Sequence, residues 1–373
     1  MLNIYGVLLG RVCLLTCKRH LSELFIALTV WLTFFVTAIQ CHFAVHITTL
    51  LLVLAFKAKT LLGFYVIFEA TVVPIVLVIF IYGYQPEKIQ ASFYLIIYTV
   101  VRRMPLLIYI LTDSSLSCLA ATLAFMVKTP LFIFHAWLPK AHVEAPVAGS
   151  IILAGVLLKL GTYGLFLILP QYAMRPILSF YLALSLLGGV VCSLLCLRDG
   201  DIKTLIAHSS VVHMGVVNLG LLRGSEVGYC GAVMISIGHG LCSPFLFAFS
   251  YHLYCSSHSR LLCNNIIAWP SLIRILGVLV SINMRLPPRL GLWSELLITI
   301  GIYGIGSIAI PFILLMIFLR ACYNLYIYTS CAHAKKSSYI KEIISLPIVQ
   351  VCVLCYRSLL YLDFLHISFL PKS

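Results

Sequence analysis

Four ionisable side chains interrupt segments of this sequence that are otherwise apolar: Glu69, Lys128, Lys159 and Glu295. An ionisable group at mid-membrane costs at least ~2.5 kcal/mol even on lenient insertion scales, so it needs a partner, a cavity or a role. Loss of water disfavours the charged form of a lysine, whereas a nearby carboxylate favours it. A partner that moves closer or further away would therefore switch such a lysine between holding and releasing a proton.

A structural interpretation competes with this one for each lysine. A long side chain near a helix end can lift its ammonium group to the membrane surface. That interpretation remains open for Lys128, but it fits Lys159 poorly because Lys159 lies near the middle of the apolar segment 148–169. For Glu69, a structural ion pair and a functional one are not exclusive. We therefore predict buried, functional roles for both lysines.

Histidines could extend a proton relay because an imidazole titrates near neutral pH. Four histidines lie in apolar segments: His135, His208, His213 and His239. A lone buried histidine is more often a hydrogen-bonded structural residue. His239 is the stronger relay candidate because the neighbouring Gly238 and Gly240 would let water or backbone approach it.

The composition requires that these side chains are positioned by membrane helices. Of 373 residues, 62% are hydrophobic and 10% are charged, whereas soluble proteins contain about 25% charged residues. Apolar runs of about 20 residues recur, and they are continuous rather than alternating, which favours helices over a β-barrel. The sequence predicts an all-α polytopic membrane protein with about 12–14 transmembrane helices. The predicted spans are 3–17, 21–39, 42–56, 60–84, 90–112, 116–138, 148–169, 176–197, 202–222, 227–254, 268–284, 289–303, 305–330 and 342–361.

Two of the apolar stretches contain helix-breaking residues beside a charge. One has Lys128-Thr129-Pro130, and the other has Pro287-Pro288 followed by Glu295. Irregular backbone at membrane depth survives only inside protein or beside a water-filled cavity. An ordinary proline kink would explain one break. Two breaks, each near a charge, predict an inverted-repeat antiporter-like bundle with two broken helices and its ion site at the breaks.

The remaining composition excludes several classes of function. The net charge is +14, but the basic residues are scattered over short connections, which indicates contact with lipid headgroups rather than nucleic acid. Their distribution does not fix the orientation in the membrane.

Cys352 and Cys355 form one CxxC without a second pair or a polar setting, so no metal site is predicted. No cleavable presequence is evident.

No soluble domain or linker is apparent, so one membrane domain is expected over residues 1–373. Within it we expect divergent N-terminal helices over 1–59, an antiporter-like core over 60–330, and a C-terminal helix and tail over 331–373.

Arg102 and Arg103 stand in the middle of the predicted span 90–112. Two adjacent arginines there would be costly and would point to different faces of a helix. They could face the interior of the bundle. Alternatively, they could reflect decoding with the wrong genetic code, since mitochondrial codes can reassign some arginine codons to serine.

A long block of the sequence resembles a known family. It runs from Met126 through Lys128-Thr129-Pro130, His135-Ala136-Trp137-Leu138-Pro139 and Glu144-Ala145-Pro146 to Leu157-Leu158-Lys159-Leu160-Gly161. This block is similar to the chain 4 family of antiporter-like membrane subunits in respiratory complex I, the mitochondrial NADH:ubiquinone oxidoreductase. Supporting segments are Phe68-Glu69-Ala70-Thr71, Asp201–Ser210 with Lys203, Gly238-His239-Gly240, and Ser294-Glu295-Leu296.

The resemblance implies an ordered set of roles. Glu69 and Lys128 would form a switching pair, Lys159 would be the central relay, His239 a link and Glu295 the distal acid. Further candidates are His135, Lys203, His208 and His213. The match is weaker before residue 60 and over the last 40 residues, and the paired arginines replace small residues of the usual pattern.

The resemblance also implies the setting of the activity. The chain would translocate protons in a mitochondrial inner-membrane NADH:ubiquinone reductase, beside other membrane-arm subunits, the lipid bilayer and water. It would bind no cofactor and no metal, because NADH, FMN, iron–sulfur clusters and ubiquinone would be bound by other subunits. The alternatives are a membrane subunit of a cation/proton antiporter and a structural membrane-arm subunit that does not pump.

Overall fold

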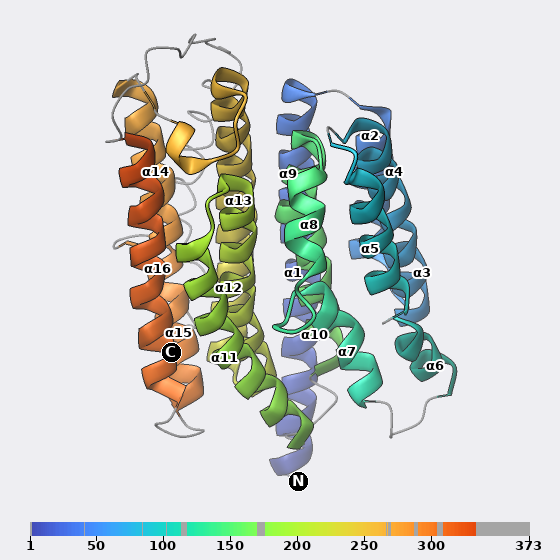
Figure 1. Ribbon diagram of the computed structural model, residues 1–373. Coiled ribbons are helices and arrows are strands. Elements are labelled where there is room, and N and C mark those ends of the chain that lie inside the picture. Colours follow the sequence, from blue (N-terminus) through green and yellow to red (C-terminus); the bar gives the residue numbers. More distant parts are fainter. Residues whose placement is uncertain are drawn as a thin grey trace.

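The computed structural model of the chain is a bundle of helices (Figure 1). It describes the chain apart from residues 1, 41, 84, 102, 113–117, 170–175, 266, 268–269, 287–289, 304–308 and 333–373. The α-helices are α1 (Leu2–Ile39), α2 (Phe43–Lys57), α3 (Leu61–Ala70), α4 (Val72–Tyr82), α5 (Lys88–Val101), α6 (Met104–Thr112), α7 (Cys118–Lys128), α8 (Trp137–Glu144), α9 (Val147–Ile152), α10 (Leu158–Ile168), α11 (Pro176–Arg198), α12 (Ile202–Arg223), α13 (Glu226–Ser257), α14 (Pro270–Met284), α15 (Leu290–Tyr303) and α16 (Ala309–Ala332). A π-helical turn, η2 (Leu153–Leu157), joins α9 to α10, and a 3-10 turn, η4 (Leu262–Asn264), follows α13.

The all-α membrane fold is confirmed. Eight helical segments of the described chain are long and apolar enough to cross a membrane, and three further apolar helices are shorter. Within the described ranges, the only β-type pairing is an isolated bridge between Asp201 and Leu261. The predicted helix at 342–361 and the Cys352–Cys355 pair lie outside the described residues, as do Arg102 and Pro287-Pro288.

Three predicted helix boundaries differ from the structure. The spans expected at 3–17 and 21–39 form one continuous helix, α1. The span expected at 90–112 is divided into α5 and α6, because Pro105 lies in the first turn of α6 and cannot donate a backbone hydrogen bond back into α5. The span expected at 60–84 is divided at Thr71, between α3 and α4.

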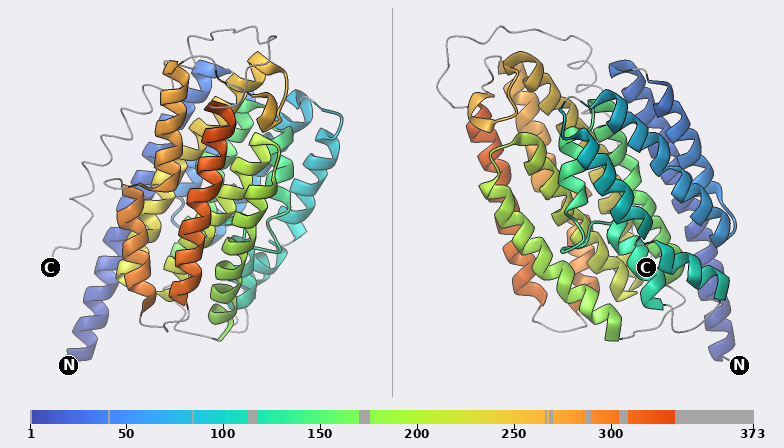
Figure 2. Two further views of the ribbon diagram at one scale, coloured as in Figure 1. Left: turned by 60° about the vertical axis from the view of Figure 1, so that its left-hand side comes forward. Right: turned by 45° about the vertical axis from the view of Figure 1, so that its right-hand side comes forward.

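The helices that carry the central ionisable side chains are the innermost ones. α12 packs against α11 and α13, and α13 also packs against α9 and α15 (Figure 2). Nearly all residues of the α9–η2–α10 segment and of α12 are buried. Apart from these few polar side chains, the helices are apolar all round, so they are stable only at the centre of the bundle.

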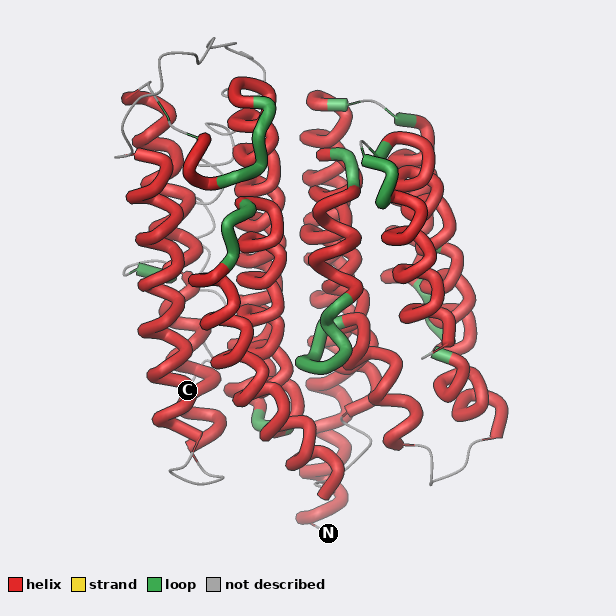
Figure 3. The backbone as a smooth tube through the Cα atoms, viewed as in Figure 1, coloured by secondary structure: helices red, strands yellow, loops and turns green. Residues whose placement is uncertain are grey.

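The break predicted at Lys128-Thr129-Pro130 is present. α7 ends at Lys128, and a loop over 129–136 leads to α8 (Figure 3). The carbonyl groups released by the break are satisfied: Trp137 Nε1 donates to the Val127 oxygen at 3.2 Å, and Asn218 Nδ2 donates to the Thr129 oxygen at 3.4 Å. Ile133 has a φ of 76°, a strained conformation for a β-branched residue that the surrounding packing has to hold in place.

The second interruption falls between α14, which ends at Met284, and α15, which begins at Leu290. The interruption therefore lies between two helices that both place side chains in the interior of the bundle. Its proline pair is not among the described residues.

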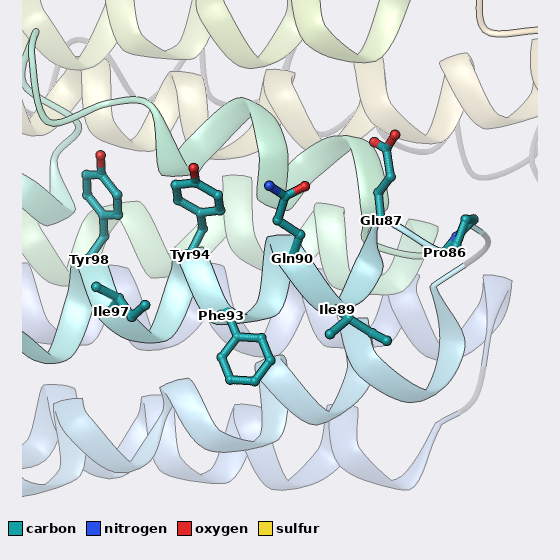
Figure 4. Close-up of a pocket in the computed structure, with 8 residues that line it drawn as sticks. All are labelled: Pro86, Glu87, Ile89, Gln90, Phe93, Tyr94, Ile97 and Tyr98. Carbon is teal, nitrogen blue, oxygen red and sulfur yellow. The ribbon is translucent and has the colours of Figure 1, made fainter.

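The outer face of α5 is apolar, as lipid contact requires. Figure 4 shows Tyr94 and Tyr98 on one side of this helix and Phe93 with Ile97 on the other. Lys140 of α8 places Nζ 3.7 Å from the centre of the Tyr94 ring, so the tyrosine side of α5 packs against α8. Phe93 and Ile97 are exposed, and an apolar side chain is stable there only against lipid or another membrane chain.

Candidate functional site

The first group of predicted site residues lies where α3, α6 and α7 meet. Glu69 Oε1 lies 3.1 Å from Arg103 Nε, which also donates to the Thr99 carbonyl. The Phe68 ring lies under two cations, with its centre 4.9 Å from Arg103 Cζ and 5.2 Å from Lys128 Nζ. In the part of the chain that the structure describes, Glu69 forms its ion pair with Arg103 and not with Lys128. We call Glu69, Arg103 and Lys128 the edge group, because the Glu69 side chain is 25% exposed.

The second group begins at the centre of the bundle with Lys159. Its side chain is fully buried, and Nζ lies 3.0 Å from His239 Nδ1 on α13 and donates to the Ala154 carbonyl at 2.6 Å. Ala154 belongs to η2, the π-helical turn just before α10, and such turns are frequent at functional sites. Gly240 permits this approach, because a Cβ there would lie 3.2 Å from Lys159 Cε and 3.1 Å from the Gly155 carbonyl.

The Lys159–His239 contact can hold a proton on either residue. A lysine ammonium can only donate, so His239 Nδ1 accepts when Lys159 is charged. When Lys159 is neutral, its amine can accept from a protonated Nδ1. The same 3.0 Å contact therefore survives a proton transfer, as a relay requires.

His213 of α12 continues the line beyond His239. The two ring centres are 5.1 Å apart. Arg285 Nη2 lies 2.7 Å from His213 Nδ1, and Asn283 Oδ1 lies 2.9 Å from His213 Nε2. Because a guanidinium only donates, Nδ1 must accept and Nε2 must carry the hydrogen. These contacts hold His213 as one neutral tautomer, and it can take a proton at Nδ1 only when Arg285 moves away.

Glu295 of α15 forms the far end of this line. Its Oε1 accepts from Arg285 Nη1 at 2.5 Å and also from Arg320 Nη1. Arg285 has a φ of 61°, just after α14 ends, and a Cβ at residue 291 would collide with its side chain. Gly291 thus lets the Arg285 guanidinium lie between His213 and Glu295.

Two asparagines stabilise the region around Glu295 by hydrogen bonds. Asn283 Nδ2 donates to Asn324 Oδ1 at 2.8 Å, and Asn324 Nδ2 donates to the Arg320 carbonyl at 2.9 Å. All of these side chains are buried. Lys159, His239, His213, Arg285 and Glu295 therefore form a continuous row of contacts across four helices and the segment after α14, which we call the central line.

The other predicted residues lie in two further places. His135 and His208 lie with their ring centres 6.2 Å apart, and His208 Nδ1 is 2.5 Å from Asp199 Oδ2. Lys203 instead packs at the end of α8, with Nζ 3.2 Å from the Ala145 carbonyl. Among the described residues, neither place forms a side-chain hydrogen bond or ion pair with the central line.

Sequence reasoning did not single out several members of these groups. Arg285 follows Met284 directly and could have been found as a charge next to the Pro287-Pro288 break. Asn283 and Asn324 carry no charge, so only their buried hydrogen bonds identify them. Asp199 stands in a connection and offers no signal in the sequence.

A bundle of membrane helices with ionisable side chains in contact across its interior is the arrangement of a proton- or cation-translocating membrane protein. A family model described as "NADH:quinone oxidoreductase/Mrp antiporter, TM" matches residues 58–112 and 112–320. The chain belongs to this family.

Curated relatives agree with the family model. NADH-ubiquinone oxidoreductase chain 4 of Mytilus edulis is 41% identical over 313 residues, which are 77% of this chain and 72% of that protein. The protein of the same name from Artemia franciscana is 38% identical over 322 residues, or 80% of this chain and 81% of that one. The resemblance seen in the sequence is thereby confirmed.

Solved structures show the same fold. A chain of respiratory complex I from Thermus thermophilus with bound NADH has a TM-score of 0.82 at 26% identity, covering 94% of this chain and 82% of that chain. A chain of the Mrp complex from Dietzia has a TM-score of 0.78 at 15% identity, covering 92% and 80%, which shows the fold alone.

Proposed function

We propose that this chain is a proton-translocating membrane subunit of NADH:ubiquinone reductase, in the inner mitochondrial membrane. The observation that carries the proposal is the central line, a row of buried contacts that begins at a lysine and ends at a glutamate. The relatives from two animals named NADH-ubiquinone oxidoreductase chain 4 support the enzyme and its location.

Proton transfer begins at Lys159. The ammonium passes its proton to His239 Nδ1, and the neutral amine keeps its hydrogen bond to the imidazolium. The proton then moves from His239 towards His213, whose ring centre is 5.1 Å away. A water molecule or a ring rotation bridges this distance, because the two rings are not directly hydrogen-bonded.

Arg285 controls the second half of the path. Its guanidinium stays charged throughout, so it directs protons without carrying one. When it turns wholly towards Glu295, His213 Nδ1 becomes free to accept a proton, and a rising charge on His213 in turn repels Arg285. Glu295 receives the proton as the last acid of the line once the guanidinium groups of Arg285 and Arg320 have moved off its carboxylate, because an adjacent cation favours the ionised acid, and His213 is then neutral again.

The edge group supplies a second switch. The Glu69 carboxylate pairs with Arg103, and the Phe68 face lies beneath both Arg103 and Lys128. A shift of Glu69 towards Lys128 stabilises the ammonium, and a shift towards Arg103 lets Lys128 release its proton.

Redox chemistry is assigned to other subunits of the assembly. NADH, FMN, iron–sulfur clusters and ubiquinone would bind there, and this chain would contact other membrane-arm subunits and lipid. The exposed apolar side chains of α5 are suited to such contacts.

Purification of the native complex tests the assignment. We expect the chain to copurify with rotenone-sensitive NADH oxidation. After reconstitution into vesicles, NADH oxidation should change the pH inside the vesicles, and the rate of this change should be the same with and without sodium in the buffer. Absence of the chain from such a complex would contradict the assignment. Pumping that requires sodium would favour the cation/proton antiporter instead.

A further inference from the structure

A second group of buried charges lies at one end of the bundle, where α8 ends and α12 begins. This is the upper end in Figure 1. It comprises His142 and Glu144 of α8, Lys203 of α12 and Arg260 from the segment after α13. We call these four residues the end cluster.

Glu144 is the buried acid of the end cluster. Its side chain is 4% exposed, and Arg260 Nη1 lies 3.5 Å from Oε1. Neither carboxylate oxygen has a hydrogen-bond partner in the part of the chain that the structure describes. A buried carboxylate with its lone pairs unused is costly, so these oxygens require water.

Lys203 and Arg260 hold this acid from two sides. Lys203 Nζ donates to the Val143 and Ala145 carbonyls, on either side of Glu144 in the chain. Arg260 is fixed by its backbone, because its carbonyl accepts from the Ile202 amide at 3.1 Å. The Arg260 side chain also donates to Gln85, which is exposed, at 3.3 Å. Arg260 thus spans from the surface to the buried carboxylate.

His142 is the member of the end cluster that packs against α13, the helix that carries His239 of the central line. Its ring stacks on Phe247 at 4.5 Å with an angle of 6°, and it is fully buried. Both ring nitrogens lack hydrogen-bond partners among the described residues. Phe247 belongs to α13, the helix whose His239 contacts Lys159, so α13 links the His142 ring to the central line.

We propose that the end cluster is a proton-uptake site that supplies Lys159 from this end of the bundle. The inference rests on the proposed function, because it needs Lys159 to be a proton relay. Water at the surface beside Arg260 and Gln85 gives a proton to the Glu144 carboxylate. Water inside the cluster passes that proton to one ring nitrogen of His142 while the other ring nitrogen releases a proton towards the neutral Lys159 amine. Glu144 ends as a carboxylate, His142 as a neutral imidazole and Lys159 as an ammonium.

Arg260 is a positioning residue in this scheme. Its ion pair with Glu144 favours the carboxylate, so it must move towards Gln85 for the acid to take up a proton. Lys203 holds the end of α8 in place through two backbone carbonyls. If the end cluster were only a structural ion pair, Glu144 would act only as an anion. The His142 nitrogens would then have no role.

Variants of the intact complex test the proposal in reconstituted vesicles. We expect Glu144→Gln to slow proton translocation by at least about tenfold, a lower bound on what a positioned acid contributes. His142→Phe keeps the stacking on Phe247 and should slow translocation to a similar extent. Glu144→Asp should restore most of the rate, because a carboxylate remains. Glu87→Gln is the matched control, since Glu87 is an exposed acid at the same end of the bundle.

Two outcomes would overturn the uptake site. One is full translocation by an assembled Glu144→Gln complex. The other is loss of assembly in both Glu144→Gln and His142→Phe complexes, with Glu144→Asp failing to restore the rate, which would make the end cluster structural. Lys159→Met separates the two proposals: if it abolishes translocation while Glu144→Gln has no effect, only the uptake site fails. If Lys159→Met has no effect, the proposed function itself fails.

Discussion

The edge group and the central line both place a buried lysine near a carboxylate, but they connect the two differently. Around Lys128 the contacts run over the faces of Phe68 and Trp137, and Glu69 is 25% exposed. Around Lys159 a hydrogen bond joins His239, the His213 ring lies 5.1 Å further on, and hydrogen bonds then run through Arg285 to Glu295, which is 5% exposed. Aromatic faces allow a cation to shift without breaking a hydrogen bond, whereas hydrogen bonds hold most side chains of the central line in one orientation. This difference supports the proposal that the edge group switches and the central line conducts.

Lys159→Met gives the sharpest test of this difference. We expect at least about tenfold loss of proton translocation, because a positioned proton donor contributes typically 10²–10⁴-fold. Assembly should be kept, since methionine fills a similar volume and removes a buried charge. Coupled NADH oxidation should fall with it. Lys140→Met, at an exposed lysine of α8, is the control. Full-rate pumping by the Lys159 variant would end the conduction role.

His239→Phe should have the next largest effect. The ring volume is nearly kept, but Lys159 Nζ loses the acceptor at 3.0 Å and retains only the Ala154 carbonyl. We expect roughly tenfold slower translocation, less than the 10²–10⁴-fold typical of a positioned acid or base, because water can partly take the place of the ring. The measurement is the initial rate of vesicle acidification. The exposed His46→Phe variant should pump normally, and equal rates for both variants would remove His239 from the path.

Glu69→Gln should have a smaller effect. An ion pair with a partly exposed partner is worth ~1 kcal/mol or less, so we expect at most about a fivefold decrease in coupled pumping. The number of protons moved per NADH oxidised should change more than the rate of NADH oxidation. The reason is that the proposed switch at the edge group would couple proton movement to NADH oxidation. A loss as large as that of Lys159→Met would place Glu69 in the conducting line rather than in a switch.

The residue at position 103 decides which cation faces Glu69. Arg103 faces the interior and is 1% exposed, but Nη1 and Nη2 have no hydrogen-bond partner within the described chain. These unpartnered nitrogens favour the reassigned-codon hypothesis, which predicts serine at 102 and 103 in peptides of the native protein. Mass spectrometry checks this. Serine would leave Lys128 as the cation for Glu69, whereas arginine would end the hypothesis and keep the pair seen in the structure.

His208→Phe should have the smallest effect. The side chains of the paired His208 and Asp199 are 14% and 22% exposed, respectively. Exposed pairs contribute little, so proton translocation should stay within about twofold of the unaltered complex. A tenfold decrease would add the His135–His208 pair to the conducting residues and would weaken the division into edge group and central line.

Both proline-containing breaks could be predicted from local residue types. The sequence predicted interruptions at Lys128-Thr129-Pro130 and near Pro287-Pro288, because proline and glycine act on the backbone locally. The first is described as a loop over 129–136, and helices end and begin on either side of the second. Helix division at Thr71 and between α5 and α6 was missed, since long apolar runs hide short local breaks.

The sequence by itself determined the membrane fold, the family and the ionisable residues that interrupt its helices. Apolar length and charge placement carry that information, because the bilayer imposes the same requirement on every span. Only the tertiary structure decided which of these residues touch. Lys159 and His239 are 80 positions apart, and His213 and Arg285 are 72 apart. Such contacts depend on how four helices pack, which no local pattern specifies.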